Sequence, residues 1–167
     1  PDINALAKAE LHEINSYWAG LGYYSRAKNL QETAKIISYK YDGFFPTDKN
    51  SLIALTGIGE YTSSAIMAIA FNRKSNVIDG NVERVFSRFY AVEKPIKESK
   101  IFIKNIAEKH LPDNRHGDYA QALMDLGSLI CTPKSPRCTM CPLLGICDVG
   151  GSTRAKQYPI KLPKKEK

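Results

Sequence analysis

All four cysteines of this 167-residue chain lie within 17 residues near its C-terminal end. They follow the spacing C-x6-C-x2-C-x5-C, at Cys131, Cys138, Cys141 and Cys147. Cysteines that only fill a hydrophobic core have no reason to gather in this way, whereas thiolates that share a metal must do so. The alternative is a pair of disulfides in a secreted protein. The spacing predicts a metal site that holds the structure of this loop.

The identity of the metal stays open at this point. Four thiolates suit tetrahedral zinc as well as an iron–sulfur cluster. Zinc sites usually combine two C-x2-C pairs, whereas this loop has one such pair, Cys138 and Cys141, and longer outer spacings. Lys134 and Arg137 lie in the same loop and are candidate phosphate contacts, although ordinary surface charge explains them equally well.

A second feature is the stretch LTGIGEYTSSAIMAIA, in which a glycine turn separates two helical segments at about residues 51–55 and 61–70. Gly57 and Gly59 permit positive φ and close approach of another backbone. The second helix opens with N–H groups that have no helical partner, and such a helix start attracts anions. Ile58 is expected to pack between the helices. The pattern favours a helix–hairpin–helix phosphate clamp, with a ligand-free helical hairpin as the alternative.

An acidic residue follows the hairpin, since Asp79 stands 20 residues after Gly59 in the sequence Ile78-Asp79-Gly80-Asn81. Taken alone, this aspartate is interpreted as a turn residue or as the N-cap of a helix that begins near Val82. Its position after a phosphate clamp makes it a candidate for chemistry as well.

The remaining pattern predicts an all-α fold, because apolar residues recur at helical spacing and no alternating strand pattern or internal repeat occurs. The expected helices cover about residues 2–9, 11–19, 26–39, 82–92, 97–110 and 118–130. In the helix at 82–92, the apolar face leaves Glu83, Arg84 and Arg88 mostly on the solvent side.

Two tyrosines stand on a glycine-punctuated turn, Gly20-Leu21-Gly22-Tyr23-Tyr24. Both could pack in the turn or core, and this is the interpretation for Tyr24. Tyr23 is a candidate wedge, because a planar side chain on a tight turn can enter a base stack and keep a duplex kinked.

The net charge of +7 is concentrated at the C-terminal end, where residues 150–167 contribute +5. Such a tail is either a solvated linker or a nucleic-acid-binding arm. No run approaches the roughly 18 apolar residues needed to span a bilayer.

Several motifs together carry a family resemblance. From about Ile3 to Cys147 the chain resembles the catalytic core of the MutY-type adenine DNA glycosylases, which belong to the helix–hairpin–helix, endonuclease-III-like superfamily. The matching segments are WAGLGYYSRAKNL, LTGIGEYTSSAI, IDGNVERV, YAQALMDLGSLIC and the cysteine spacing. The resemblance implies a helix–hairpin–helix DNA glycosylase fold with a C-terminal iron–sulfur loop. It divides the chain into a partial six-helix barrel lobe (1–74, with the hairpin at about 48–70), a cluster lobe (75–148) and a basic linker or tail (149–167).

The resemblance also implies roles for the candidate residues. The metal becomes a 4Fe–4S cluster on Cys131, Cys138, Cys141 and Cys147. Contacts with DNA fall to Thr56, Gly57, Ile58, Gly59, Tyr23, Lys134 and Arg137, although relatives often carry proline at the position of Thr56. The catalytic set is Asp79, Tyr61 and Asn81: the aspartate opposes positive charge on the sugar, the tyrosine hydrogen-bonds near it, and the asparagine positions the groups. Relatives that cut the strand carry lysine at the position of Tyr61, and tyrosine cannot form their imine, so a monofunctional enzyme is expected.

The implied activity is removal of adenine mispaired with 8-oxoguanine or guanine, by a monomer acting on double-stranded DNA in the bacterial cytoplasm, at the nucleoid and away from membranes. The family's glutamate general acid and its 8-oxoguanine-reading domain match no residues here, so we expect a core whose rate is lowered by about 10²–10⁴-fold. The alternatives are a thymine mismatch glycosylase of the same branch, a non-catalytic DNA-binding scaffold, and a zinc-bound structural module.

Overall fold

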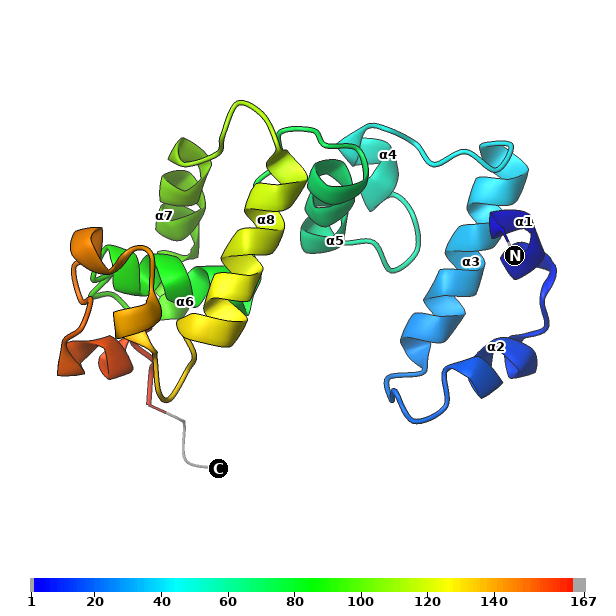
Figure 1. Cartoon of the computed structure of the whole chain (residues 1–167). Coiled ribbons are helices and arrows are strands. Elements are labelled where there is room, and N and C mark those ends of the chain that lie inside the picture. Colours follow the sequence, from blue (N-terminus) through cyan, green and yellow to red (C-terminus); the bar gives the residue numbers. More distant parts are fainter. Residues whose placement is uncertain (1, 164–167) are drawn as a thin grey trace. The chain divides into compact units, whose positions relative to one another are not determined.

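The computed structural model describes residues 2–163, and this range contains helices and turns but no β-strand, as the sequence predicts (Figure 1). The chain forms two compact units, residues 1–63 and 64–167. The division falls within one helix and earlier than the predicted boundary at residue 74. Among the described residues, no helix has both the length and the apolar character required to cross a membrane.

The first unit is built on one long helix. Its elements are α1 (Ile3–Lys8), α2 (Leu11–Tyr17), α3 (Ser25–Lys40), α4 (Lys49–Ile53) and the start of α5 (Glu60–Ala65). Helix α1 packs against α3 through small buried residues, Ala7, Ala27 and Ala34, which let the two backbones approach. The side-chain amide of Gln31 on α3 donates to the carbonyl of Ala9 at 2.5 Å and fixes the end of α1.

The second unit begins with the last residues of α5 and contains the cysteine loop. Its elements are the π-helix η1 (Ile66–Ala70), α6 (Gly80–Phe89), α7 (Ile96–Lys109), α8 (His116–Asp125), the π-helix η2 (Leu126–Ile130) and the 3-10 turns η3 (Cys138–Met140), η4 (Leu144–Ile146) and η5 (Thr153–Gln157). Val82 and Phe86 of α6 meet Ile103 and Ala107 of α7 in a buried core. Helix α8 crosses η1 closely at Gly117, where a Cβ would lie 2.9 Å from a backbone oxygen.

Helix α6 is the element where the sequence pattern misleads. Arg84 and Arg88 were predicted on the solvent side, and this is wrong: their exposed fractions are 8% and 2%. A helical apolar stripe assumes that one face of the helix is covered. Helix α6 instead contacts α7, α8 and η2, so several of its faces are buried. Both arginines remain inside because backbone carbonyls accept their hydrogen bonds.

The chain after the last cysteine also packs on the second unit. Val149, Ala155 and Tyr158 are buried, and the backbone N–H of Ile96 donates to the carbonyl of Ile160 at 2.9 Å. The sequence suggested a linker or tail over 149–167; the part up to residue 160 is folded. Residues 164–167, which carry three of the basic side chains of that segment, lie outside the described residues.

Candidate nucleic-acid interface and metal centre

The glycine turn between α4 and α5 has the geometry that a helix–hairpin–helix requires. Gly57 has a φ of +78°, and a Cβ at this position would lie 2.7 Å from the Cβ of Asn29 on α3. Both the backbone conformation and the close approach therefore demand glycine. The N–H of Ile58 donates to the carbonyl of Leu55 at 3.1 Å and closes the turn. Nothing lies within 4 Å of a Cβ built on Gly59, so this end of the turn is open.

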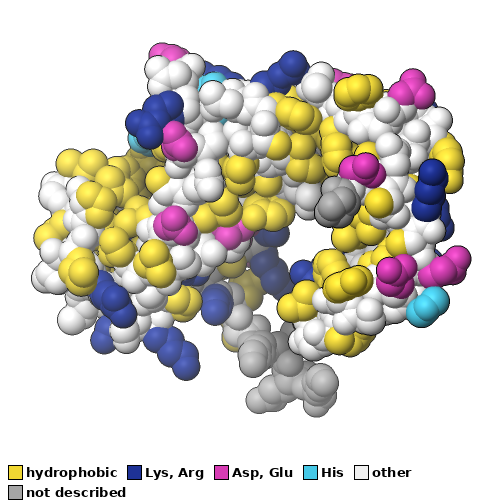
Figure 2. All heavy atoms as spheres, turned by 45° about the vertical axis from the view of Figure 1, so that its right-hand side comes forward, with side chains coloured by type: hydrophobic (Ala, Val, Ile, Leu, Met, Phe, Trp, Pro, Cys, Tyr) yellow, Lys and Arg dark blue, Asp and Glu magenta, His cyan; other side chains and the backbone are white. Residues whose placement is uncertain are grey.

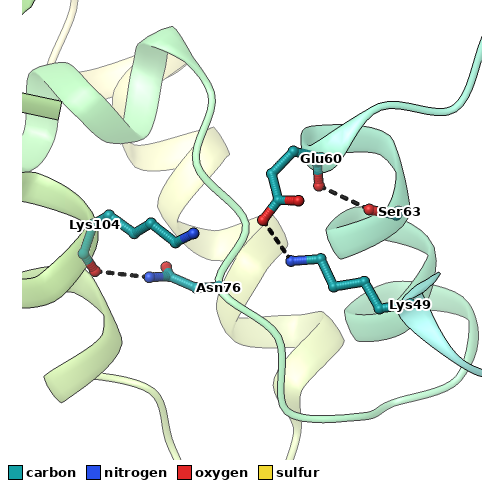
Figure 3. Close-up of polar contacts among 5 residues, drawn as sticks. All are labelled: Lys49, Glu60, Ser63, Asn76 and Lys104. Carbon is teal, nitrogen blue, oxygen red and sulfur yellow. Dashed lines mark hydrogen bonds and ion pairs between the residues drawn. The ribbon is translucent and has the colours of Figure 1, made fainter. Parts of the chain in front are cut away.

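Side chains fasten the hairpin on both sides. The hydroxyl of Thr33 on α3 donates to the carbonyl of Thr56 at 2.7 Å. Figure 3 shows Lys49 of α4 reaching Glu60 at the start of α5, with 2.7 Å between Nζ and Oε1. Asp48 caps α4 by accepting from the N–H of Ser51, a hydrogen bond that lowers the pKa of this carboxyl.

The fastened hairpin presents a helix start to the outside. The first N–H groups of α5 have no carbonyl four residues earlier within the helix, and a helix start of this kind attracts anions. Glu60 stands in this first turn, where its negative charge would oppose a phosphate, and Lys49 compensates it. Tyr61 follows in the same turn with 45% of its surface exposed. The arrangement suits a backbone-mediated phosphate contact.

The turn before α3 exposes an aromatic ring in an unusual backbone conformation. Tyr23 has a φ of +49° and is 82% exposed. Positive φ is uncommon for residues other than glycine. The guanidinium of Arg26 lies 5.7 Å from the Tyr23 ring centroid and 5.3 Å from that of Trp18, whose indole N–H donates to the carbonyl of Gly22. Tyr24 was interpreted as a packed residue but is half exposed.

Figure 2 shows exposed hydrophobic side chains interspersed with charged ones on one face of the molecule.

Asp79 is the N-cap of α6, as its sequence context predicts. Its Oδ1 accepts from the backbone N–H groups of Asn81 and Val82, both at 2.8 Å, and its Oδ2 accepts from the side-chain amide of Asn81 at 2.9 Å. The preceding segment is anchored in the same unit, because the side chain of Asn76 donates to the carbonyl of Lys104 at 2.8 Å (Figure 3). The carboxylate is therefore held in one orientation at a helix start.

Arg84 extends this arrangement toward the cysteine loop. Its guanidinium donates to Asn81 Oδ1 at 2.9 Å, to the Gly127 carbonyl at 2.6 Å and to the Cys131 carbonyl at 2.8 Å. Burial, and secondarily the charge of Arg88, lowers the pKa of Arg84, yet arginine keeps its charge at any ordinary pH. Arg84 was not among the residues predicted for this site, and its only signal in the sequence is a pair of arginines four positions apart after a capping aspartate.

The four cysteines line a single cavity. Apart from Arg88 and Gly150, the rest of its lining is apolar: Ile130, Pro136, Leu144, Val149 and Ala155. Burial raises the pKa of the Cys147 thiol. In the range the structure describes, no three histidine, cysteine or acidic side chains are arranged to hold one metal ion. Four thiols around one shared space suit a polynuclear iron–sulfur cluster as well as a single zinc ion.

The remaining predicted residues keep their expected exposure without a demonstrated role. Lys134 and Arg137 lie exposed on the cysteine loop, which is compatible with a phosphate contact and with ordinary surface charge. The structure joins Asp79 with Asn81 in the second unit, and Thr56 and Gly57 with α3 in the first, whereas Ile58 bonds within the turn and Gly59 faces open space. The catalytic and DNA-binding roles remain predictions.

A helix–hairpin–helix turn, a capping aspartate after it and a four-thiol loop near the C-terminal end define the class: a helical glycosylase-like protein with an iron–sulfur site. Residues 1–113 match the HhH-GPD superfamily of base excision DNA repair proteins, and residues 131–147 match the iron–sulfur binding domain of endonuclease III. This chain belongs to the HhH-GPD superfamily of base excision DNA repair proteins. The 4Fe–4S assignment is confirmed, and the zinc alternative is set aside.

Curated relatives carry the name adenine DNA glycosylase. The protein from Buchnera aphidicola subsp. Acyrthosiphon pisum is 39% identical over 167 residues, which cover 99% of this chain and 48% of that protein. The human protein is 39% identical over 150 residues, covering 88% of this chain and 28% of its own length. This chain thus spans about half the length of the first of these relatives, and less of the second.

Solved structures agree on the fold. A thermostable thymine-DNA glycosylase is 29% identical with a TM-score of 0.79, over 88% of this chain and 69% of that one. A trapped endonuclease III–DNA covalent intermediate is 26% identical with a TM-score of 0.71, over 89% and 70%. The predicted all-α glycosylase fold with a C-terminal cluster loop is confirmed.

Proposed function

We propose that this chain is the catalytic core of a monofunctional adenine DNA glycosylase, which hydrolyses the N-glycosidic bond of adenine mispaired with 8-oxoguanine or guanine. The observation that carries the proposal is the carboxylate of Asp79, fixed by three hydrogen bonds at the start of α6. The names of relatives that are 37–40% identical to it support the choice of base.

The chemistry follows from charge. When the N-glycosidic bond breaks, its electron pair leaves with the base, which takes up a proton, and positive charge develops on the deoxyribose. A carboxylate that is already oriented stabilises this charge without reorganising. Water then adds its oxygen to the sugar and releases a proton. Tyr61 offers no amine for an imine, so the strand stays intact. Protonation of the base needs an acid, and the family's glutamate matches no residue here.

The partner in this proposal is double-stranded DNA with a mispaired base. The helix start after Gly59 would hold a backbone phosphate, as would Lys134 and Arg137 on the cysteine loop. The exposed ring of Tyr23 would fill the stack after the target base is flipped out. Contacts of this kind to the backbone position the protein without reading sequence. Solved complexes of endonuclease III with DNA have the same fold, which supports this assignment.

The test is adenine release from an A:8-oxoguanine duplex in single-turnover conditions. We expect Asp79→Asn to lower the rate by about 10²–10³-fold, because asparagine keeps the helix cap but removes the charge. Asp113→Asn, at an exposed aspartate of the same unit, is the matched control and should leave the rate unchanged. Equal rates for Asp79→Asn and the parent chain would contradict the proposal.

The expected slow rate of the chain needs its own comparison. The chain should release adenine slowly, and faster when an N-terminal segment with a family-like glutamate is joined to it. Full family rates from the chain alone would contradict the expected impairment. Duplex binding without release in either form would instead favour a non-catalytic scaffold.

A thymine-specific enzyme is the second candidate, favoured by the similarity to a thymine-DNA glycosylase structure, whereas Tyr61 suits both candidates. A panel of A:8-oxoguanine, A:G and T:G duplexes separates the two. Release of thymine without adenine would replace the first assignment.

A further inference from the structure

We propose that the segment Val149–Ile160 is the outer wall of the iron–sulfur site, held in place by Arg88, and that it protects the cluster from water and oxidants. The family match to the iron–sulfur domain ends at residue 147, before this segment begins. The inference rests on the match to the iron–sulfur domain and does not depend on the proposed base specificity.

The wall is part of the cavity that the four cysteines share. Val149, Gly150 and Ala155 line this cavity together with the sulfurs. Val149 and Ala155 are each 1% exposed, and with Tyr158 they form a buried cluster against which Cys138 and Cys147 pack. Apolar atoms thus cover the cysteines on the side where the chain continues.

Arg88 fastens this wall to the beginning of the cysteine loop. Its side chain is 2% exposed, and its Nε donates to the carbonyl of Tyr158 at 3.1 Å. Its two terminal nitrogens donate to the carbonyls of Thr132 at 2.8 Å and Pro133 at 3.0 Å. One of them also lies 3.3 Å from the sulfur of Cys131. The rigid planar guanidinium therefore fixes two distant segments at once.

Backbone contacts secure both ends of the segment. The N–H of Asp148 donates to the carbonyl of Phe89 at 3.1 Å, and the N–H of Ile96 donates to the carbonyl of Ile160 at 2.9 Å. Gly150 passes so close to the loop that a Cβ would lie 2.8 Å from the carbonyl oxygen of Leu144. The segment Val149–Ile160 therefore packs over the cysteine loop, and contacts with α6, α7 and the loop hold it there.

The physical consequence concerns solvent. The exposure of an iron–sulfur cluster and the hydrogen bonds to its thiolates govern its properties, and the apolar shell around a metal site controls solvent access. The apolar side chains of Val149 and Ala155 limit the access of solvent to the cluster, and the N–H donor of Arg88 stabilises negative charge on the Cys131 thiolate. A polar side chain placed in this wall should therefore speed the release of iron, although the four cysteines are unchanged.

The experiment compares two glutamine substitutions in the cluster-loaded full chain, in the absence of DNA. Ala155→Gln places an amide in the wall, whereas Lys156→Gln changes its exposed neighbour. Visible absorbance near 400 nm and iron captured by a chelator are followed after addition of ferricyanide, with helix content checked by circular dichroism. We expect loss of the cluster to be about 10-fold faster in Ala155→Gln and unchanged in Lys156→Gln.

Parent-like cluster loss in folded Ala155→Gln would overturn the proposal, and so would equal acceleration in Lys156→Gln. If Ala155→Gln does not fold, Val149→Thr gives the same test, because threonine keeps the volume and adds only a hydroxyl to the wall. Faster loss in Val149→Thr supports the wall, and a parent-like rate contradicts it. Failure of glycosylase activity would leave these outcomes unaffected.

Discussion

The hairpin of the first unit and the cysteine loop of the second are held in place in similar ways, but the hairpin is open to solvent and the loop is covered. Both are irregular segments fastened to a helix by side chains that bond to backbone carbonyls: Thr33 at the hairpin, Arg88 at the loop. The hairpin turns its open helix start outward, and the nearby turn exposes the strained Tyr23. The loop turns inward and is covered by the chain that follows it.

This contrast separates binding from stability. Polar groups that are buried must have partners, and removing one partner costs more than the bond itself contributes. Exposed groups can stay unpaired because water satisfies them, so they remain available to a ligand. Substitutions of buried polar groups that hold the loop should therefore lower the free energy of unfolding, whereas substitutions on the open side of the hairpin should change affinity for DNA.

The largest effect should come from Arg88→Ala. The change removes the guanidinium that donates to the buried carbonyl of Tyr158 and to the part-buried carbonyls of Thr132 and Pro133. A buried acceptor left without a donor costs about 1–3 kcal/mol and a part-buried one costs less, so the free energy of unfolding should fall by roughly 3 kcal/mol. Anaerobic denaturant unfolding of the cluster-loaded protein measures it. Arg137→Ala, at an exposed arginine of the same loop, should stay within about 0.5 kcal/mol. If Arg88→Ala and Arg137→Ala both lowered the free energy of unfolding by a similar small amount, the contrast between the covered loop and the open hairpin would be wrong.

Substitution of the two glycines of the hairpin should have a smaller effect on the free energy of unfolding, and the two variants can be compared directly with each other. Gly57→Ala meets both a φ of +78° and Asn29 at 2.7 Å, so the free energy of unfolding should fall by about 1–3 kcal/mol. Gly59→Ala meets nothing within 4 Å and should cost less than about 0.5 kcal/mol.

The affinity of the same two variants for a duplex completes the test. In Gly59→Ala the added methyl group stands at the open helix start, where a phosphate would sit, so affinity should fall although the protein stays stable. Fluorescence anisotropy with a labelled duplex measures the affinity. Unchanged duplex binding by stable Gly59→Ala would mean that the hairpin is only a structural turn.

The features that the sequence predicted have local causes. The glycine turn, the aspartate cap and the cysteine spacing each depend on residues close together in the chain, so their chemistry is readable without the fold. Asp79, for example, bonds to the second and third residues after it. The role predicted for its hydrogen-bonded partner Asn81 came instead from the family resemblance.

The features that the sequence did not predict have distant partners. Arg88 bonds to residues more than forty positions away, and nothing within α6 indicates that these carbonyls would surround it. The covering role of residues 149–160 was hidden in the same way, because a basic composition is typical of a solvated tail while Val149, Ala155 and Tyr158 decide the packing. The strained backbone of Tyr23 was likewise invisible, since its sequence context suggests only a turn.

Substitution of Tyr23 should combine a small change in stability with a loss of affinity for DNA, and so it separates the two roles directly. Tyr23→Gly removes an exposed ring and relieves a positive φ, while glycine adds freedom to the unfolded chain; these terms oppose each other, so the free energy of unfolding should change by less than about 1 kcal/mol. Stacking of an aromatic side chain on a base contributes about 1–3 kcal/mol, so affinity for a mispaired duplex should fall by roughly 10-fold. Tyr24→Gly, at the half-exposed neighbour, should leave affinity unchanged. A large loss of stability in Tyr23→Gly would show that the ring stabilises the fold. Equal affinity of Tyr23→Gly and Tyr24→Gly for the duplex would show that Tyr23 does not act as a wedge in DNA.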